Sequence, residues 1–151
     1  MIKILCVGKL KEKYFVEATL EYIKRIKKFT NIEIIEVPDS NIDDMNIALE
    51  KEKKHIEKYI SERDYIITLE IEGTQLSSTE LAKKIDNTFI ENSNIVFIIG
   101  GSYGIHNDIK KQSKFKLSFS KMTFPHQLFR VLLLEQIYRA YKINNNERYH
   151  K

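Results

Sequence analysis

The sequence contains very little cysteine: Cys6 is the only one among its 151 residues. A single thiol cannot form an intrachain disulfide. Cys6 lies within the apolar run Ile4–Val7, so we interpret it as a small buried hydrophobe and not as a nucleophile. Without a second cysteine, a metal site would depend on the histidines. These are His55, His106, His126 and His150. They are scattered along the chain, and their spacing indicates no metal site.

Long apolar runs are also missing. No stretch approaches the roughly 20 apolar residues that a membrane-spanning helix requires. The short apolar segment at the N-terminus is followed closely by Lys9, Lys11 and Lys13, and no small-residue cleavage pattern accompanies it. We therefore expect a cytoplasmic protein without membrane contact.

No internal repeat, low-complexity tract or linker interrupts the chain. Its 151 residues match the commonest size of one domain, and its hydrophobic content of 42% is enough to form one core. We therefore predict a single domain over residues 1–151.

Short apolar segments alternate with amphipathic ones along the chain. Strands are predicted over Ile2–Gly8, Ile32–Val37, Tyr65–Ile71, Ile95–Ile99 and Phe115–Phe119. Helices are predicted over Lys11–Phe29, residues 46–62, residues 78–91 after a Ser77/Glu80 capping box, a short segment after Ile105, and residues from Pro125 to about Ile143. This alternation predicts an α/β fold with a largely parallel five-stranded sheet flanked by helices.

The last predicted helix is apolar around nearly its whole circumference between Leu128 and Ile143. Such a helix must be buried on more than one side. One side can pack on its own sheet, and the other needs a second surface. A second copy of the chain would supply that surface and make a homodimer, while burial within the monomer remains the alternative.

Positive charge is concentrated in the last third of the chain. Residues 101–151 carry ten Lys or Arg against three Asp or Glu, whereas residues 1–100 carry fifteen against eighteen. A basic segment of this kind favours a polyanionic partner such as RNA. The lysines in question are Lys110, Lys111, Lys114, Lys116 and Lys121. Each of them fits an ordinary solvated side chain equally well.

A glycine turn, Gly100-Gly101-x-x-Gly104, follows a predicted strand and precedes a predicted helix. Glycines at such a place let the backbone approach a ligand closely. A dinucleotide fingerprint would read G-x-G-x-x-G and would have an acidic residue about 20 positions later. Ser120 and Lys121 stand there instead, so a nucleotide-dependent oxidoreductase is a weak alternative.

A second loop precedes the last helix and mixes hydroxyl groups with apolar side chains. Its hydroxyls come from Ser118, Ser120 and Thr123, and its apolar side chains from Phe119, Met122 and Phe124. This mixture suits a small ligand that has a flat base and a polar end.

Three segments together resemble the RlmH family of ribosomal RNA methyltransferases, which belong to the SPOUT superfamily. They are IIGGSYG at residues 98–104, LSFSKMTFPHQLFRVLLLEQIYRAYKI at residues 117–143, and the terminal YHK. The resemblance also includes the opening MIKILCVGKLKEKYF and the central ITLEIEG, and so extends over nearly the whole chain.

The resemblance implies an α/β domain with a deep C-terminal trefoil knot, an obligate homodimer, and S-adenosylmethionine bound within the knot. It further implies methyl transfer to N3 of a pseudouridine in 23S ribosomal RNA of the assembled ribosome. By position, it places the cofactor contacts at Leu69, Gly100, Phe119, Ser120, Lys121, Met122, Thr123 and Phe124. A non-catalytic RNA- or ribosome-binding protein is the alternative function.

Methylation at N3 of pseudouridine requires removal of a proton, so a base or an anion-stabilising group is expected. The resemblance favours the C-terminal tail, with Tyr149 stacking on the target base and His150 assisting proton removal. Arg130 is a third candidate, for contact with phosphate or for anion stabilisation. His126 fits a base or a local hydrogen bond. The i,i+4 pair Glu135–Arg139 fits a structural ion pair at least as well as a catalytic one.

One departure from the family pattern concerns the turn before the tail. Asn144-Asn145-Asn146 stands there in place of a glycine-containing turn. Asparagine tolerates the left-handed conformation, so we expect the turn to be preserved.

Overall fold

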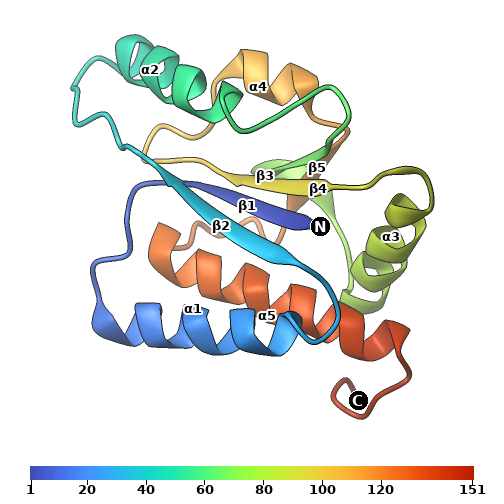
Figure 1. The fold of residues 1–151 in the computed structure, drawn as a ribbon. Helices are drawn as coiled ribbons and strands as arrows, with labels where there is room; N and C mark the ends of the chain where they lie inside the picture. Colours follow the sequence, from blue (N-terminus) through green and yellow to red (C-terminus); the bar gives the residue numbers. More distant parts are fainter.

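The computed structural model describes residues 1–151 and contains one five-stranded sheet between two layers of helices (Figure 1). The strands are β1 (Ile2–Val7), β2 (Ile32–Val37), β3 (Tyr65–Gln75), β4 (Ile95–Ile99) and β5 (Phe115–Ser118). Their order across the sheet is β2-β1-β4-β3-β5, and every neighbouring pair is parallel. The predicted α/β class with a parallel five-stranded sheet is confirmed.

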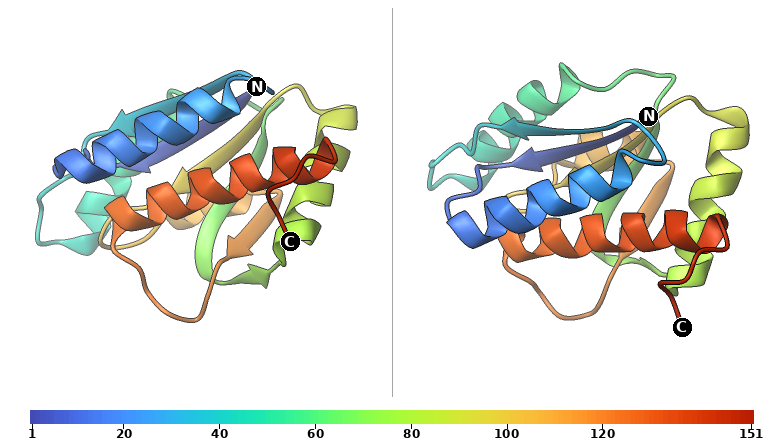
Figure 2. Two further views of the ribbon diagram at one scale, coloured as in Figure 1. Left: turned by 90° about the horizontal axis from the view of Figure 1, so that it is seen from below. Right: turned by 60° about the horizontal axis from the view of Figure 1, so that its bottom comes forward.

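The helices are α1 (Lys13–Ile26), α2 (Met45–Glu57), α3 (Ser78–Glu91), α4 (Asn107–Gln112) and α5 (His126–Asn144). In both views of Figure 2, α1 and α5 lie side by side across one face of the sheet. α3 packs at the end of α5 on the same face, while α2 and α4 cover the opposite face (Figure 1). None of the helices combines the length and apolar character needed to cross a membrane.

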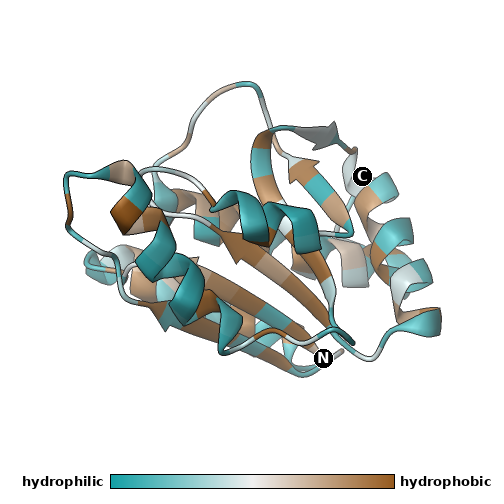
Figure 3. Cartoon of the chain, turned by 90° about the horizontal axis from the view of Figure 1, so that it is seen from above, coloured by the Kyte–Doolittle hydropathy of each residue, from teal (hydrophilic) through white to brown (hydrophobic).

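Two apolar clusters fill the space between the sheet and its helices. The alternation of side chains along β4 shows the division, since Ile95 and Phe97 point toward α1, α3 and α5, whereas Val96 and Ile98 point toward α2 and α4. All four side chains are fully buried, as expected for a central strand of a parallel sheet. Figure 3 shows apolar strands beneath α2 and α4, whose outer surfaces are mostly hydrophilic. Cys6 is buried in the larger cluster, and burial raises its pKa to about 12, so the thiol stays protonated.

β3 extends further than predicted. The sequence suggested an end at Ile71 because Gly73 indicates a loop, but the strand continues to Gln75. Its pairing with β5 reaches Leu69, is interrupted, and resumes at Thr74 opposite the same residue, Leu117. A Cβ at position 73 would lie 2.6 Å from the Lys116 carbonyl oxygen, so only glycine lets the chain return to β5. The interruption leaves residues 70–73 out of register with β5, as a bulge within β3.

The C-terminus of α5 is closed by the asparagine turn. Asn146 adopts a left-handed conformation with φ of 54°. Its N–H donates to the Ile143 carbonyl at 3.0 Å, and the Glu147 N–H donates to the Lys142 carbonyl at 2.9 Å. This pair of bonds is a Schellman cap, which usually contains glycine at the left-handed position. The expectation that asparagine preserves the turn is confirmed.

Candidate functional site

A cavity of about 370 Å³ opens at the carboxyl ends of β3, β4 and β5. The chain leaves β3 toward α3 on one face of the sheet and leaves β4 toward α4 on the other face (Figure 1). Adjacent parallel strands whose connections diverge in this way leave a crevice between them, where ligands of α/β proteins bind. The walls are formed by the bulge of β3, at residues 69–72, and by two loops, residues 99–105 and residues 117–124.

The glycine turn after β4 is folded against itself. The Gly104 N–H donates to the Gly101 carbonyl at 3.0 Å, and Gly104 has φ of +81°. A Cβ at position 100 would lie 2.4 Å from the Gly104 carbonyl oxygen. Gly100 therefore has no room for a side chain, and the turn exposes its backbone to the cavity.

The loop after β5 is held by its own hydroxyl groups. Ser118 Oγ donates to the Ser120 carbonyl at 3.1 Å, and Ser120 Oγ accepts a bond from the Met122 N–H at 3.0 Å. Its aromatic side chains pack on the first turn of α5. The Phe129 ring lies 4.8 Å from Phe119, edge on, and 6.1 Å from Phe124, stacked. One wall of the cavity is thus an aromatic cluster, and the loop backbone forms its rim.

The cavity brings together most of the residues that the sequence placed at a cofactor site. Its lining includes Leu69, Gly100, Phe119, Ser120, Met122, Thr123 and Phe124. Lys121 belongs to the same loop but is exposed and does not line the cavity. His126, at the start of α5, also lines it.

The sequence analysis missed Glu70, and it treated Lys110 only as part of a basic surface. Both line the cavity. The Glu70 side chain is 7% exposed, and its Oε1 lies 3.4 Å from Lys110 Nζ. The carboxylate that follows the buried run of residues 66–68 within β3 is the signal that could have identified Glu70, because ligand sites in parallel sheets collect toward the carboxyl ends of strands.

The segment before α2, together with α2 itself, contacts the glycine turn and the start of α4 on the side away from the cavity. Tyr103 Oη donates to the carbonyls of Ile42 and Asp43 at 3.3 and 3.2 Å. Just past the turn, His106 caps α4, since its Nδ1 accepts the Asp108 N–H at 2.9 Å. Its Nε2 must then carry the proton, and it donates to Glu50 of α2 at 3.1 Å.

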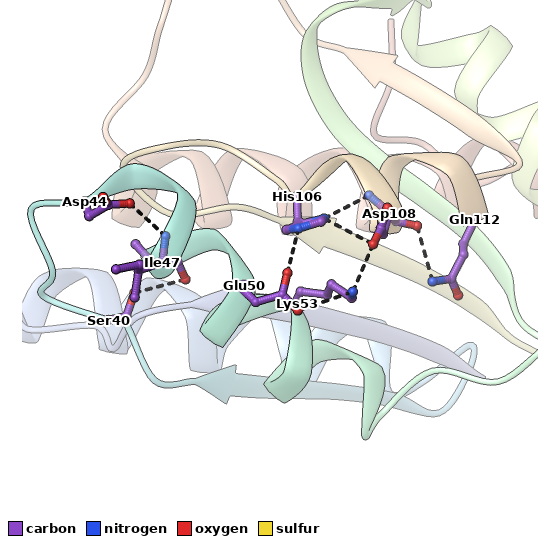
Figure 4. A network of polar contacts seen from close by, with 9 residues as sticks. Ser40, Asp44, Ile47, Glu50, Lys53, His106, Asp108 and Gln112 are labelled. Atoms are coloured by element: carbon purple, nitrogen blue, oxygen red, sulfur yellow. Dashed lines mark hydrogen bonds and ion pairs between the residues drawn. The ribbon is translucent and has the colours of Figure 1, made fainter.

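Figure 4 shows this network together with a second connection between the two helices. Lys53 of α2 lies 2.9 Å from Asp108 and 3.5 Å from Glu50. The Asp108 partner raises the pKa of Lys53, and Lys53 lowers the pKa of Asp108. α2 therefore fixes the position of α4 and of the turn that leads into it.

A buried carboxyl group lies directly beneath the turn. Glu52 is 3% exposed, its Oε2 has no hydrogen-bond partner, and its Oε1 would lie 3.3 Å from a Cβ at Gly101. Burial raises the pKa of Glu52, and the neighbouring Asp39 carboxylate raises it further. The folded state therefore holds a proton on Glu52 more tightly than the unfolded chain does.

This raised pKa gives a testable dependence of stability on pH. The free energy of unfolding falls as the pH rises from the ordinary pKa of glutamate to the raised pKa of Glu52 in the folded state. At pH values above the raised pKa, the cost of the buried charge is constant. Glu52→Gln should therefore raise the free energy of unfolding at pH 7.5 by about 1 kcal/mol. Urea unfolding at pH 7.5 and pH 3.5 measures the effect, which should vanish at the lower pH, where both chains are neutral at this position. The exposed Glu62→Gln is the control, and a destabilised Glu52→Gln at pH 7.5 would contradict the prediction.

Arg130 lies away from the cavity. Its side chain is 4% exposed, and its guanidinium donates to Glu36 at 2.7 Å and to the Gly8 carbonyl at 3.1 Å. Beside it, Gln127 Oε1 accepts the Lys11 N–H at 2.9 Å. These bonds tie the first turns of α5 to the segment between β1 and α1. In this structure Arg130 supports the start of α5 and does not line the cavity.

The C-terminal tail folds back onto the outer side of α5. The Tyr149 ring lies 4.9 Å from Tyr138, edge on, and its Oη donates to Glu135 at 3.1 Å. Arg139 also binds Glu135, at 2.6 Å, which confirms the predicted i,i+4 pair. The same guanidinium lies 3.1 Å from His150 Nδ1. Burial and the Glu135 carboxylate raise the pKa of Tyr149 to about 12, so its hydroxyl stays a donor.

The tail does not reach the cavity of its own chain. Phe129 lines the cavity, whereas Tyr149 packs on Tyr138, nine residues further along α5. At 1.5 Å per residue this separation is roughly 13 Å along the helix axis. Neither Tyr149 nor His150 lines the cavity. The two predicted parts of the site, cofactor loops and tail, are therefore separate within one protomer.

The sequence matches the family described as "Predicted SPOUT methyltransferase" over residues 1–150. The chain is 51% identical over 158 residues to a putative ribosomal RNA large subunit methyltransferase H of Methanococcus vannielii, with 99% of each chain covered. It is 47% identical over 154 residues to the ribosomal RNA large subunit methyltransferase H of Caldicellulosiruptor saccharolyticus, with all of both chains covered.

Solved structures share the fold at low sequence identity. A probable methylase family protein from Haemophilus influenzae superimposes with a TM-score of 0.58 and 16% identity, over 99% of this chain and 70% of that one. A tRNA methyltransferase from Aquifex aeolicus gives a TM-score of 0.52 and 14% identity, over 91% of this chain and 69% of that one. These likenesses concern the arrangement of strands and helices alone.

Proposed function

This chain belongs to the SPOUT methyltransferase family, and on that premise we propose that it transfers a methyl group from S-adenosylmethionine to N3 of a pseudouridine in 23S ribosomal RNA. The relatives that share about half of its residues over their full length are named for methylation of large-subunit ribosomal RNA. The observation that carries the proposal is the cavity, which brings the bulge of β3 and the loops after β4 and β5 together at one point. Family membership favours methyl transfer over the oxidoreductase alternative.

The residues of the cavity fit the methyl donor. Its volume of about 370 Å³ lies within the range of small-molecule sites. The aromatic cluster of Phe119, Phe124 and Phe129 offers a surface for a flat base, and the backbone of the glycine turn that lines the cavity offers donors and acceptors. S-adenosylmethionine, when bound, supplies a methyl group that its sulfonium activates for transfer. The chain's contribution is then mainly to position the nucleophile in line with that methyl.

We assign proton removal to the tail. His150 supplies an imidazole that can accept the proton. Tyr149 stays protonated, so its role is to stack on the target base and to donate a hydrogen bond. Arg130 is left out of this mechanism because its guanidinium is occupied by Glu36 and Gly8.

Since the tail is distant from its own cavity, the proposed enzyme is a homodimer in which the tail of one copy serves the cavity of the other. The C-terminal segment is proposed to form the trefoil knot of the family. The partner surface is the outer face of α1 and α5, where Val16, Leu20 and Leu128 are exposed. Apolar side chains on two adjacent helices suit a contact with an identical surface.

A charge placed on this face should separate the copies. Leu20 is 60% exposed, so Leu20→Glu leaves the fold intact but puts a carboxylate at the proposed contact. We expect the wild type to have the mass of a dimer and Leu20→Glu to have the mass of a monomer by size-exclusion chromatography with light scattering. Ile90→Glu, on α3 and 78% exposed, is the matched control and should remain a dimer. A monomeric wild type, or a dimeric Leu20→Glu, would contradict this arrangement.

The basic last third of the chain supports RNA as the substrate. Lys111, Lys114 and Lys116 are exposed and lie near β5 at the edge of the sheet, where phosphates can reach them. Contacts of this kind weaken as salt rises. We propose the assembled ribosome in the cytoplasm as the place of action.

Transfer of labelled methyl from S-adenosylmethionine tests this function. Ribosomes that lack the modification, free 23S ribosomal RNA and transfer RNA are incubated with the protein in parallel. Label should enter ribosomes and be absent from transfer RNA. Binding to ribosomes without any transfer would support the non-catalytic alternative.

A further inference from the structure

The cavity contains one pair of opposite charges that the proposed mechanism does not use. Glu70 Oε1 and Lys110 Nζ lie 3.4 Å apart on its wall, contributed by the bulge of β3 and by α4. Lys110 is the only lysine or arginine that lines the cavity. The pair lies on the α4 side, while Phe119 and Phe129 form the wall on the α5 side.

The carboxylate of this pair is held in place. Thr68, which is fully buried, donates from Oγ1 to Glu70 Oε2 at 2.6 Å. Thr68 Oγ1 in turn lies 2.9 Å from Ser113 Oγ, and Ser113 Oγ donates to the Phe115 carbonyl at 2.7 Å. One oxygen of Glu70 is thus fixed by neutral partners, and Oε1 is left facing Lys110 and the cavity.

Lys110 is the more exposed member, with a side chain that is 30% exposed. Its contact with Glu70 is an ion pair, with no hydrogen bond formed between them. Both groups therefore retain hydrogen-bonding capacity that a ligand can use. A fixed carboxylate beside an ammonium matches a ligand group that itself carries an ammonium beside a carboxylate.

We infer that Glu70 and Lys110 form the subsite for the amino acid end of the methyl donor, with Glu70 binding its α-ammonium and Lys110 its α-carboxylate. This inference rests on the proposed function, since it names the part of the cavity that receives the donor's zwitterionic group. The aromatic cluster across the cavity is left for the adenine. The sulfonium, which joins the two ends of the donor, then lies between them.

Comparing the binding of two ligands tests this subsite independently of the rest of the cavity. S-adenosylhomocysteine has the amino acid end, whereas 5′-methylthioadenosine keeps the adenosine and the thioether and lacks that end. Lys110→Gln and Glu70→Gln should each lower the affinity for S-adenosylhomocysteine at least about tenfold, as measured by isothermal titration calorimetry. A loss of this size corresponds to one hydrogen bond to a charged group. Their affinity for 5′-methylthioadenosine should stay within about twofold of the wild type, because neither changed group contacts the nucleoside.

The controls lie off the cavity: Lys111→Gln on the same helix and Glu91→Gln on α3, both exposed. Both should bind the two ligands as the wild type does, and thermal unfolding should show all four variants folded. Equal losses for both ligands, or no loss in Lys110→Gln and Glu70→Gln, would overturn the subsite. A wild type that binds neither ligand would overturn the proposed function, and the subsite with it.

Discussion

Gly100→Ala is expected to lose methyl transfer by at least about 100-fold, together with most of its affinity for S-adenosylhomocysteine. A Cβ at this position would lie 2.4 Å from the Gly104 carbonyl oxygen and 2.6 Å from its carbonyl carbon. Both are backbone atoms of the turn itself, so the clash can be relieved only if the turn opens. Opening would move backbone that lines the cavity and would displace the donor.

Gly101→Ala is a milder substitution in the same turn, against which the effect of Gly100→Ala can be compared. Its added Cβ would meet side chains, Val7 Cγ1 at 3.0 Å and Glu52 Oε1 at 3.3 Å, which can shift by a few tenths of an ångström. We therefore expect Gly101→Ala to lose less affinity and less activity than Gly100→Ala. Titration with S-adenosylhomocysteine and initial rates of transfer measure both. Wild-type affinity in Gly100→Ala would show that the turn does not bind the donor.

Deletion of residues 149–151 is expected to remove methyl transfer, by about 100-fold or more, while affinity for S-adenosylhomocysteine stays within about twofold. Loss of a general base typically has an effect of this size on rate. The affinity should be preserved because the tail is proposed to contact the target base and not the donor, and neither Tyr149 nor His150 lines the cavity of its own chain.

Tyr149→Phe separates the ring of the tail from its hydroxyl group. The variant keeps the edge-on contact with Tyr138 but loses the hydrogen bond to Glu135. It should retain more activity than the deletion, since stacking on the target base is preserved. Near-normal turnover by the deleted chain would exclude the tail from catalysis.

Much of the fold was predictable because its strands are short, apolar and bounded by turn signals. β2 and β4 have the predicted bounds, and α3 begins after Ser77 as its capping box indicates. The end of β3 was wrong, because a glycine that lets a strand return to its neighbour has the same sequence pattern as one that ends a strand.

The candidate site was predictable only in part. Glycines and mixed polar and apolar residues directly after a strand distinguished the two loops, but their assignment to a cofactor came from the family resemblance. The contacts between distant residues could not be predicted. Glu70 and Lys110 are 40 positions apart, and Arg130 and Glu36, which form a hydrogen bond, are 94 positions apart. Only the order of strands in the sheet brings such groups together, and no local pattern encodes it.

Methyl transfer to N3 of a pseudouridine in large-subunit ribosomal RNA gives a product that can be identified directly. Ribosomes lacking the modification are incubated with the protein and with S-adenosylmethionine whose methyl group is deuterated. The 23S RNA is then digested to nucleosides for mass spectrometry. The account predicts one trideuterated 3-methylpseudouridine per ribosome. Deuterated methyl on a different nucleoside, or none in any RNA despite a protein that binds S-adenosylhomocysteine, would contradict it.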